Sequence, residues 1–537
     1  DQSQTGLRLL ELWNEHGHAL IPEINGSFSL AFFNATEKSL TIYTDRLASR
    51  SVWFSREGNL WYASNFPSAI AAVRETRPHL DPAGLWSLFA TTRHVGSHGI
   101  FHGIQNLHAG QLSILRTEQQ PDVSQWWQRR YLPKNGVSPH EWGEHIAQTL
   151  RTSAKRLETV TPDPHLFLSG GLDSRIAAAT IGGRLKTHTL CSQYNMEARI
   201  AASVSRHLHL EHQTMIRTPY WYLDTFEAAA LIGSGNFNIA HAHFMIPVQQ
   251  IKASNHNACF FLGDLLENFN KHYFHIEKDG TASFVPEKLP DIYHKLYPYS
   301  HPNPDELSGL FQPEIKKLLR EAWREALVCT AKNVFSVSQD DKDRFDTLGR
   351  WANCSFTPTY NMIECICPLS NVRNLMFDND VIDLHLTIPA DIRGRGILHP
   401  WTLWNLNKAL PFIPNANYWL PPVVPKSLTK LTWRIRPWIG KSRRKIMSLF
   451  HKRPAPRTEG SWPLLAEICR SDSRYRDFIQ NCLYDKDALP PEIFDPEAIN
   501  ICWREFLDGN SSRYYEINML ISFGLLHRLL PTSGLKA

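Results

Sequence analysis

The chain has 537 residues, of which 42% are hydrophobic and 20% are charged, and its formal net charge is +5. This length predicts two to four domains with a large core, and so small a net charge gives no indication of a protein that binds nucleic acid. The apolar stretches are shorter than the roughly 20 residues that span a bilayer, and nine scattered cysteines are typical of small buried side chains in the reducing cytoplasm.

The first 130 or so residues predict a β-rich domain that follows a single helix. Apolar residues at Leu7, Leu10 and Trp13 have helical spacing. Short runs separated by Gly and Asn turns then predict strands at 28–33, 39–43, 61–63 and 111–115. A cluster of Pro, Gly, Asn and Ser at 133–139 predicts a boundary. We therefore assign residues 1–132 to a first domain and residues 138–537 to a second.

The second domain begins with an alternation of strands and helices, which is typical of a parallel sheet covered by helices on both faces. Ser138 is placed to cap the first helix, which runs through 145–157. The segments that follow predict strand, helix, strand, helix and strand in turn, at 165–168, 176–181, 186–190, 196–208 and 212–216. From about residue 290 the chain predicts mostly helix.

The most informative stretch is a Ser-Gly-Gly-Leu-Asp-Ser sequence between an apolar strand and a helix. Its glycines let backbone amides approach an anion, and the helix start adds free N–H groups and a positive dipole end. After a strand, this sequence is the signature of ATP pyrophosphatases, which cleave ATP between the α and β phosphates. The structural alternative is a glycine turn capped by Asp or Ser. We assign the nucleotide site to Leu168, Ser169, Gly170, Gly171, Leu172, Asp173 and Ser174.

A second acidic site is predicted where the apolar run 258–262 ends. Asp264 and Glu267 are three residues apart, so they would share a face if a helix begins there. One carboxylate could bind Mg²⁺ together with Asp173, and the other could orient the substrate amine or its proton; both could instead be simple partners of a helix dipole. We assign Asp173 and Glu267 to the metal and Asp264 and Glu267 to catalysis. Two further residues are assigned to the nucleotide site, Gly263 and, near adenine, Leu190.

These stretches make the chain resemble the asparagine synthetase family, in which an Ntn-hydrolase-type glutaminase domain precedes an ATP-pyrophosphatase synthetase domain. The resemblance extends to residues 25–32, 45–50 and 101–110 in the first domain, and to residues 378–383 and 388–389, which resemble the helix that closes the family's pocket. It implies an α/β synthetase domain with a parallel sheet, the use of ATP and Mg²⁺, and an amide formed from an adenylated carboxylate.

The chain also departs from the family pattern. The nucleophilic cysteine and the Asn-Gly-Glu motif of the glutaminase are not visible, and residues 4–6 stand in place of the glutamine clamp. We therefore expect the first domain to be incomplete or degenerate. Cys191 and residues 195–197 replace the family's motifs near the nucleotide. The family's late lysine, which stabilises the transition state, is assigned to Lys426, with Lys430 as the next candidate.

Three functions fit the resemblance. The first is amidation of a small acid or sugar acid with glutamine or ammonia. The second is intramolecular amide closure, as in lasso-peptide macrolactam synthetases and β-lactam synthetases, which resemble this family without its glutaminase. The third is a catalytically inactive binding scaffold. The expected partners are a small-molecule or peptide carboxylate, glutamine or ammonia, and, for a peptide substrate, a peptide-processing protein.

Two other features admit functional readings. The segment 426–457 has eleven Lys and Arg and no Asp or Glu, which suits either an anionic partner or a solvated basic surface. Histidines with metal-ligand spacing occur in two groups, but no cysteine or carboxylate completes either group, so we expect structural roles for them. They are His207, His209 and His212, and His241 and His243.

Overall fold

The computed structural model describes residues 2–536 apart from 219, 236–238, 272–282, 297–300, 302–306, 308, 352–357, 418, 425–427 and 429–464. Within this part of the chain, no helix is both long enough and apolar enough to cross a bilayer. The cysteines described there are all free, and most are buried, as the sequence predicts. Lys426, Lys430 and almost all of the basic segment lie outside the described residues.

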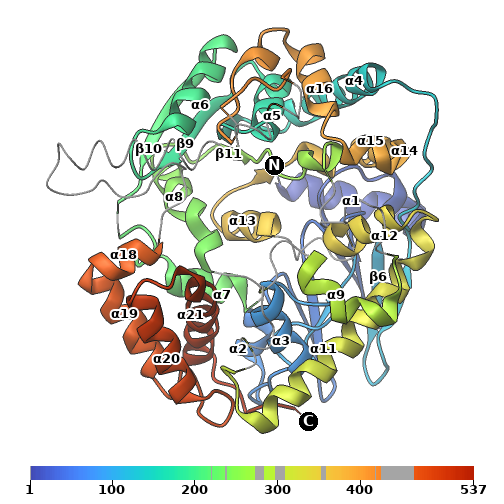
Figure 1. Ribbon diagram of the computed structural model, residues 1–537. Coiled ribbons are helices and arrows are strands. Elements are labelled where there is room, and N and C mark those ends of the chain that lie inside the picture. Colours follow the sequence, from blue (N-terminus) through green and yellow to red (C-terminus); the bar gives the residue numbers. More distant parts are fainter. Residues whose placement is uncertain are drawn as a thin grey trace, which may run out of the picture.

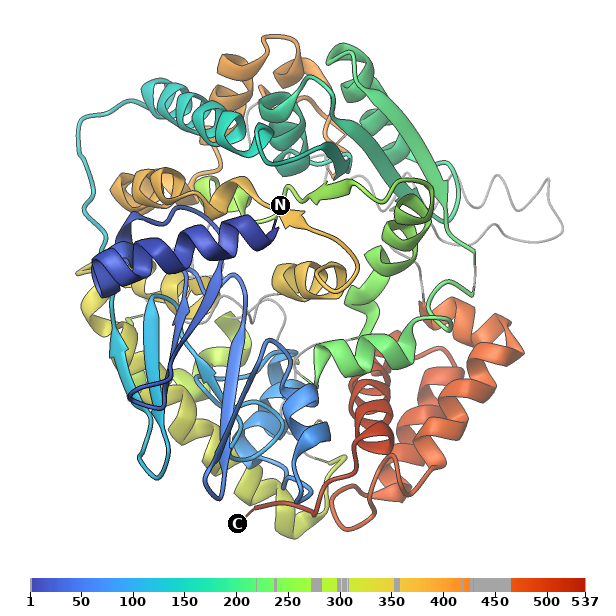
Figure 2. The same cartoon turned by 180° about the vertical axis from the view of Figure 1, so that it is seen from behind.

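Two antiparallel sheets form the first domain (Figure 2). One has the order β1-β2-β6-β7 and the other β4-β3-β5, and a small core that includes Ile42, Phe54 and Leu115 lies between them. Helix α1 (Gln2–His16) packs on the first sheet, where Trp13 stacks on Phe32 at 4.0 Å between ring centroids. The strands are β1 (Ser29–Asn34), β2 (Ser39–Thr44), β3 (Val52–Glu57), β4 (Leu60–Ser64), β5 (Gln105–Leu107), β6 (Gln111–Arg116) and β7 (Asp122–Gln125). The predicted helix and the four predicted strands are confirmed; β3, β5 and β7 were missed.

A five-stranded parallel sheet forms the centre of the second domain, with the order β10-β9-β8-β11-β12. From β8 the chain passes first to β9 on one side and later to β11 on the other, so the direction of winding reverses between β8 and β11. In such sheets, ligands bind outside the carboxyl ends of the strands at this reversal. The strands are β8 (Asp163–Phe167), β9 (Lys186–Cys191), β10 (Glu211–Ile216), β11 (Ala258–Phe261) and β12 (Val372–Arg373).

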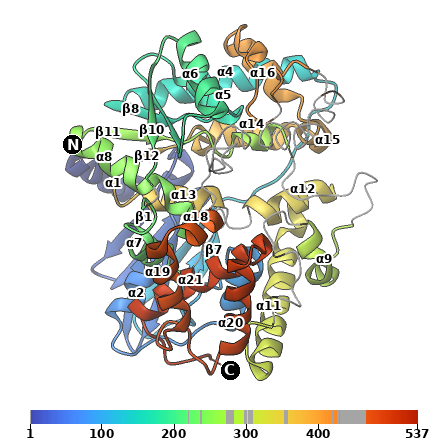
Figure 3. The same cartoon turned by 60° about the vertical axis from the view of Figure 1, so that its left-hand side comes forward.

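Helices cover both faces of this sheet, as predicted (Figures 1 and 3). On one face lie α4 (Pro139–Glu158), α5 (Asp173–Ile181), α6 (Met196–His207) and α16 (Leu398–Leu406); on the other lie α8 (Met245–Ser254) and α13 (Pro358–Ile366). Helix α4 begins six residues before the predicted segment. Ser138 caps it in a reciprocal pair with Glu141, in which each side chain accepts a hydrogen bond from the other residue's backbone N–H.

Further helices complete the two domains, and some of them pack across the interface between the domains. Helix α21, near the C-terminus, packs against α7 and against α3 of the first domain, and all three contribute to one continuous apolar core. These helices are α2 (Pro67–Val73), α3 (Pro82–Thr91), α7 (Phe226–Gly233), α9 (Leu289–Leu296), α11 (Pro313–Val334), α12 (Asp341–Asp346), α14 (Asn379–Thr387), α15 (Ala390–Gly394), α18 (Leu465–Ser471), α19 (Ser473–Tyr484), α20 (Pro496–Leu507) and α21 (Tyr514–Leu529).

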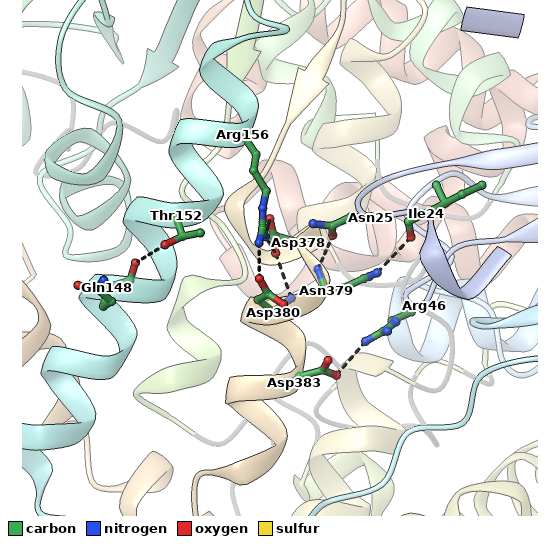
Figure 4. A network of polar contacts seen from close by, with 10 residues as sticks. All are labelled: Ile24, Asn25, Arg46, Gln148, Thr152, Arg156, Asp378, Asn379, Asp380 and Asp383. Atoms are coloured by element: carbon green, nitrogen blue, oxygen red, sulfur yellow. Dashed lines mark hydrogen bonds and ion pairs between the residues drawn. The ribbon is translucent and has the colours of Figure 1, made fainter. Parts of the chain in front are cut away.

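The first turn of α14 is held between the two domains by polar contacts (Figure 4). Arg156 of α4 binds Asp378 at 2.9 Å and Asp380 at 2.6 Å. From the first domain, Asn25 accepts a hydrogen bond from the backbone N–H of Asn379 at 2.7 Å. Of residues 378–383, Asp378 lines a cavity between the two domains, and none lines the cavity at the Ser-Gly-Gly loop. That this helix closes a pocket, as the resemblance implies, stays a prediction.

Candidate active site

The Ser-Gly-Gly loop lies at the carboxyl end of β8, next to the reversal of winding. Helix α5 begins at Asp173, and no side chain caps its start, so its first N–H groups can donate to an anion. Two glycines are needed here for close packing. A Cβ on Gly170 would lie 2.5 Å from the Cβ of Ala416, and a Cβ on Gly263 would lie 2.4 Å from the Cα of Ser174.

The hydroxyls of the loop hold its shape. The Oγ atoms of Ser169 and Ser174 lie 2.9 Å apart and share a hydrogen bond. The backbone N–H of Gly171 donates to Ser169 Oγ at 3.1 Å, and that of Ser169 donates to Ser174 Oγ at 3.1 Å. The serines therefore order the amides of the loop as well as carrying donors of their own.

Arg175 fixes a distant segment against the loop. It is fully buried, and its guanidinium donates to the carbonyls of Leu410, Ile413 and Pro414 at 2.8–3.1 Å. Burial lowers the pKa of Arg175 to about 10, so it remains a cation at neutral pH. The segment continues to Ala416, whose N–H donates to the carbonyl of Gly170 at 3.0 Å. Arg175, which directly follows the Ser-Gly-Gly-Leu-Asp-Ser sequence, thus positions one wall of the site.

Three carboxylates meet beside the loop. Burial, together with the charges of Glu267 and Asp173, raises the pKa of Asp264 to about 7. His399, which is buried, lies 3.4 Å from Asp173, and burial lowers its pKa. The helix expected to bring Asp264 and Glu267 onto one face does not begin there. Leu265 has φ +71°, and a short 3-10 helix, η3 (Leu266–Phe269), starts only after it.

The loop opens on a cavity of about 360 Å³. Seven of the residues assigned from the sequence line it: Leu168, Ser169, Gly171, Asp173, Ser174, Leu190 and Gly263. Asp264 lines it as well, whereas Gly170, Leu172 and Glu267 do not. Gly170 instead faces Ala416, and Leu172 packs against the core. Lys426 falls outside the described residues, so its assignment stays a prediction.

Sequence reasoning missed the remainder of the cavity wall. These residues come from β8, β9, α6, α13, the segment after β10, the 3-10 helix η2 (Ile239–Phe244) and the segment held by Arg175. They are Phe167, His188, Thr189, Glu197, Arg217, His243, Phe244, Met362, Ala416 and Asn417. Of these, Glu197 was noticed within residues 195–197, which stand in place of a family motif near the nucleotide, and His243 was noticed only for its metal-ligand spacing. The alternation of inward residues along β8 and β9 could have found Phe167 and His188; the others carry no local signal.

A chain of hydrogen bonds crosses the sheet and includes His188. Burial opposes the charge of Asp163, but hydrogen bonds from Lys186 and His165 hold its pKa below the usual value. His165 Nε2 therefore donates to Asp163 at 2.6 Å, and its Nδ1 accepts from His188 Nε2 at 2.8 Å. Burial lowers the pKa of His188 to about 3, so the ring is neutral. Its Nδ1 is thus left as an acceptor.

No three His, Cys, Asp or Glu side chains of the described residues are placed to hold a metal ion alone. The structural role expected for His207, His209 and His212 stays a prediction, and the side chain of His241 lies outside the described residues. At the loop, burial and the charges of Glu267 and Asp173 together raise the pKa of Asp264. Such an oxygen-only set fits Mg²⁺, which usually takes one or two carboxylates together with phosphate oxygens and water.

A second cavity of about 280 Å³ lies between the two domains. It is lined by Asn25 of the first domain, by Arg156 of α4 and by Asn374 and Asp378 after β12. Asn374 also donates to the backbone carbonyl of Asp264 at 2.9 Å. One side chain therefore contacts both the second cavity and the carboxylate site.

Two stretches in the first half of the chain match known families. Residues 2–127 match the glutamine amidotransferase domain and residues 145–256 match asparagine synthase. The chain is also 27% identical over 229 residues to the glutamine-hydrolyzing asparagine synthetase 2 of Bacillus subtilis (strain 168). This match covers 38% of the chain and 30% of the relative, so the chain spans about a third of the length of the relative it matches.

Two solved structures show weaker likeness. The NH3-dependent NAD synthetase of Campylobacter jejuni is 14% identical, with a TM-score of 0.18 over 35% of this chain and 95% of that chain. The NMN synthetase of Francisella tularensis is 15% identical, with a TM-score of 0.18 over 47% of this chain and 93% of that chain. The two family matches lie inside the predicted domains 1–132 and 138–537, whose boundaries themselves stay a prediction.

Proposed function

Because the chain carries the amidotransferase and synthase domains of the asparagine synthetase family, we propose that it is an ATP-dependent amide-forming ligase. It adenylates a carboxylate, releases pyrophosphate and joins the acyl group to ammonia or an amine. The observation that carries this proposal is the position of the Ser-Gly-Gly loop. It lies at the reversal of the sheet and opens on a cavity that Asp173 and Asp264 also line.

In this proposal the triphosphate of ATP lies over the loop and the start of α5. The uncapped N–H groups at the start of the helix donate to the phosphate oxygens, and the amides of Ser169 and Gly171, which donate to the hydroxyls of Ser174 and Ser169, keep the loop in shape. Adenine lies against Leu190, which lines the same cavity from the end of β9. These contacts fix the α-phosphate where a bound carboxylate can attack it, and positioning of this kind contributes roughly 7–11 kcal/mol.

Asp173 and Glu267 would hold Mg²⁺, which supplies positive charge to the departing pyrophosphate. Asp264 lines the same cavity beside them, and its carboxylate would orient the attacking amine or accept its proton. In the sequence interpretation Lys426 would stabilise the transition state, and that role stays part of the proposal.

The nitrogen comes from ammonia, from glutamine or from an amine of the substrate itself. The cavity between the domains supports an external source, because Asn374 links its wall to Asp264. In an intramolecular closure, as in the macrolactam and β-lactam synthetases, the same adenylate would be captured by the substrate's own amine. A peptide substrate and a peptide-processing partner belong to that second case.

The test is ATP–pyrophosphate exchange with a set of carboxylic acids, amino acids, sugar acids and peptides. We expect exchange with at least one of them, and a loss of at least about 100-fold in Asp173→Ala, because the residue lines the phosphate end of the cavity. Asp224→Ala, which alters an exposed residue outside the cavity, is the control. If none of the tested acids supports ATP–pyrophosphate exchange, the catalytically inactive scaffold is favoured. Full exchange in Asp173→Ala would overturn the proposed site.

A further inference from the structure

Arg373 carries a guanidinium that lacks a partner. It lies on β12, the edge strand of the parallel sheet, and it lines the cavity between the two domains. Its Nε is buried, and within the described residues its side chain forms neither a hydrogen bond nor an ion pair. Burial lowers the pKa of Arg373, yet a guanidinium stays protonated near neutral pH. The cavity therefore faces a positive charge that the described part of the chain does not neutralise.

Two other arginines show how this protein satisfies a guanidinium that has only a structural role. Arg175 directs both Nη groups to backbone carbonyls, and Arg50 donates to the carbonyl of Val372 at 3.1 Å. Cys259 interacts with Arg373 electrostatically, but burial raises the pKa of this thiol and keeps it neutral. A buried guanidinium normally needs an anion or several acceptors, and for Arg373 the cavity is the place that can supply them.

A second group without a partner lines the same cavity from α4. Ser153 is fully buried, and its Oγ has no hydrogen-bond partner. A serine inside a helix usually faces solvent or donates to the carbonyl four residues earlier, as the neighbouring Thr152 does to Gln148 at 3.2 Å (Figure 4). Ser153 does neither, so its hydroxyl is available to a group bound in the cavity.

The first domain adds a third donor to this wall. Asn25 Oδ1 accepts the backbone N–H of Asn379 at 2.7 Å, which leaves its Nδ2 as a donor. Arg156 lines the cavity as well, but it binds both carboxylate oxygens of Asp378 at 2.9 Å. Of the two cations in the wall, Arg373 is thus left without a carboxylate. A single unbalanced positive charge favours a monoanion over a dianion.

The rest of this wall suits the carbon chain of a small organic acid. Leu157, Val372 and Phe377 give it an apolar side, and its volume is about 280 Å³. Nε–H and one Nη–H point in parallel from the same side of a guanidinium, and together they fit the two oxygens of a carboxylate. The cavity shares no lining residue with the cavity at the Ser-Gly-Gly loop, so a ligand here is separate from the proposed active site.

We propose that the cavity between the domains binds a small monocarboxylate. Arg373 holds its two oxygens, Ser153 and Asn25 donate to the same carboxylate, and the carbon chain packs on the apolar side. Because the ligand contacts both domains, its binding stabilises the interface between them. Asn374, the next residue after Arg373, donates to the backbone carbonyl of Asp264 at 2.9 Å and so connects this site with the carboxylates at the loop. The inference does not depend on the proposed function.

The test measures the melting temperature of the full chain, without ATP, in straight-chain monocarboxylates from acetate to hexanoate and in the corresponding neutral amides, at constant ionic strength. A ligand that binds only the folded protein raises the melting temperature. We expect at least one acid to raise it at concentrations about 10-fold lower than its amide does.

Four variants assign this difference to the cavity. Ser153→Ala removes a hydroxyl without a partner, so it should not lower the melting temperature of the unliganded protein, but it should weaken the effect of the acid about 3- to 10-fold. Arg373→Met should remove the difference between acid and amide, and Arg373→Lys, which keeps the charge without the paired donors, should keep part of it. Arg206→Met, at an exposed position of α6, is the matched control and should keep all of it.

Three results would overturn the inference. The first is that acids and amides act alike on the unaltered protein, or that Ser153→Ala and Arg373→Met both keep the full difference. The second is that Arg217→Met removes the difference while Arg373→Met keeps it, because the acid would then bind in the cavity at the loop. The third is that inorganic phosphate, largely a dianion at about pH 8, acts at lower concentrations than every acid.

Discussion

The two ends of the cavity are built in different ways. The phosphate end comes from one continuous stretch, residues 168–174, completed by Gly263 and Asp264 at the end of the neighbouring strand. The rest of the cavity wall is assembled from residues that are far apart in the sequence, among them Arg217, His243 and Met362. In the proposed function, the first end binds the phosphates of ATP, and the rest of the wall faces the other parts of the ligands. The proposed phosphate site is thus local in the sequence, and the rest of the cavity wall is not.

The largest expected effect tests how tightly the phosphate end is packed. In Gly263→Ala, the new methyl would lie 2.4 Å from the Cα and 2.6 Å from the N of Ser174, and backbone atoms cannot rotate away. The start of α5 must shift, and a displacement of about 1 Å at such a site can cost about 100-fold in rate. Pyrophosphate release should fall by that amount.

Gly6→Ala is the matched control for this change. A Cβ on Gly6 meets no atom within 4 Å, and the residue lies in α1 of the first domain. It should keep full activity. A fully active Gly263→Ala variant would show that the phosphate end tolerates displacement. It would contradict the view that this end depends on the close packing of Gly263 against Ser174.

The next largest effect is expected at Arg175, which joins the phosphate end of the cavity to residues 410–416. Arg175→Met removes the donors to three buried carbonyls that hold 410–416 against the loop. We expect the free energy of unfolding to fall by about 2–4 kcal/mol, measured by urea denaturation. Arg206→Met, on the surface of α6, should change it by less than about 0.5 kcal/mol. Equal losses in the two variants would contradict the anchoring role of Arg175.

A smaller effect is expected at the domain interface, away from both ends. Ser51 donates to Glu364 of α13, and burial raises the pKa of that carboxyl to about 7. Because the folded state then holds a proton that the unfolded state has lost, this group's contribution to stability falls as the pH rises from about 4.5 to 7. Glu364→Gln should therefore be more stable than the unaltered protein by about 1–2 kcal/mol at pH 8 and equal to it near pH 4.5.

Thermal unfolding across this pH range measures the effect, with the exposed Glu158→Gln as the control. A pH-independent difference between Glu364→Gln and the unaltered protein would reject the raised pKa. Neither variant should alter ATP–pyrophosphate exchange, because neither residue lines the cavity at the loop.

The smallest effect is expected from the ion pairs at the start of α14. Arg156 is 45% exposed and Asp380 is 54% exposed; Asp378 is buried, but it also accepts a hydrogen bond from the backbone N–H of Asp380 and so keeps a partner without Arg156. Exposed pairs contribute about 0.2–1 kcal/mol and are weakened by salt. Arg156→Gln should therefore destabilise the protein by no more than about 1 kcal/mol, and by less at high ionic strength. A larger, salt-independent loss would mean that this interface supports both ends of the cavity.

The sequence predicted those parts of the molecule whose signal is local. The alternation of strands and helices indicated the parallel sheet, and Ser138 marked the start of α4. The Ser-Gly-Gly loop could be assigned as the proposed phosphate site because it is one short run of backbone with two glycines. Asp264 was also found, but its geometry was predicted wrongly, since Leu265 interrupts the expected helix with φ +71°.

Other parts could not be predicted because they depend on packing between distant segments. Arg217, for example, has no motif around it. Only the structure shows that its side chain is buried beside the cavity and that its Nε and Nη2 have no hydrogen-bond partner. The contact of Ala416 with Gly170 depends on Arg175 holding a segment more than 200 residues away. Short strands such as β5 and β12 take their extended form from pairing with neighbours rather than from their own residues.

The central claim is that the loop directs cleavage of ATP between the α and β phosphates. The most direct measurement is the identity of the nucleotide product when the protein is incubated with ATP, Mg²⁺ and an acid that supports exchange. The account predicts AMP and pyrophosphate in equal amounts, and neither product from Asp173→Ala. Formation of ADP and inorganic phosphate would contradict it.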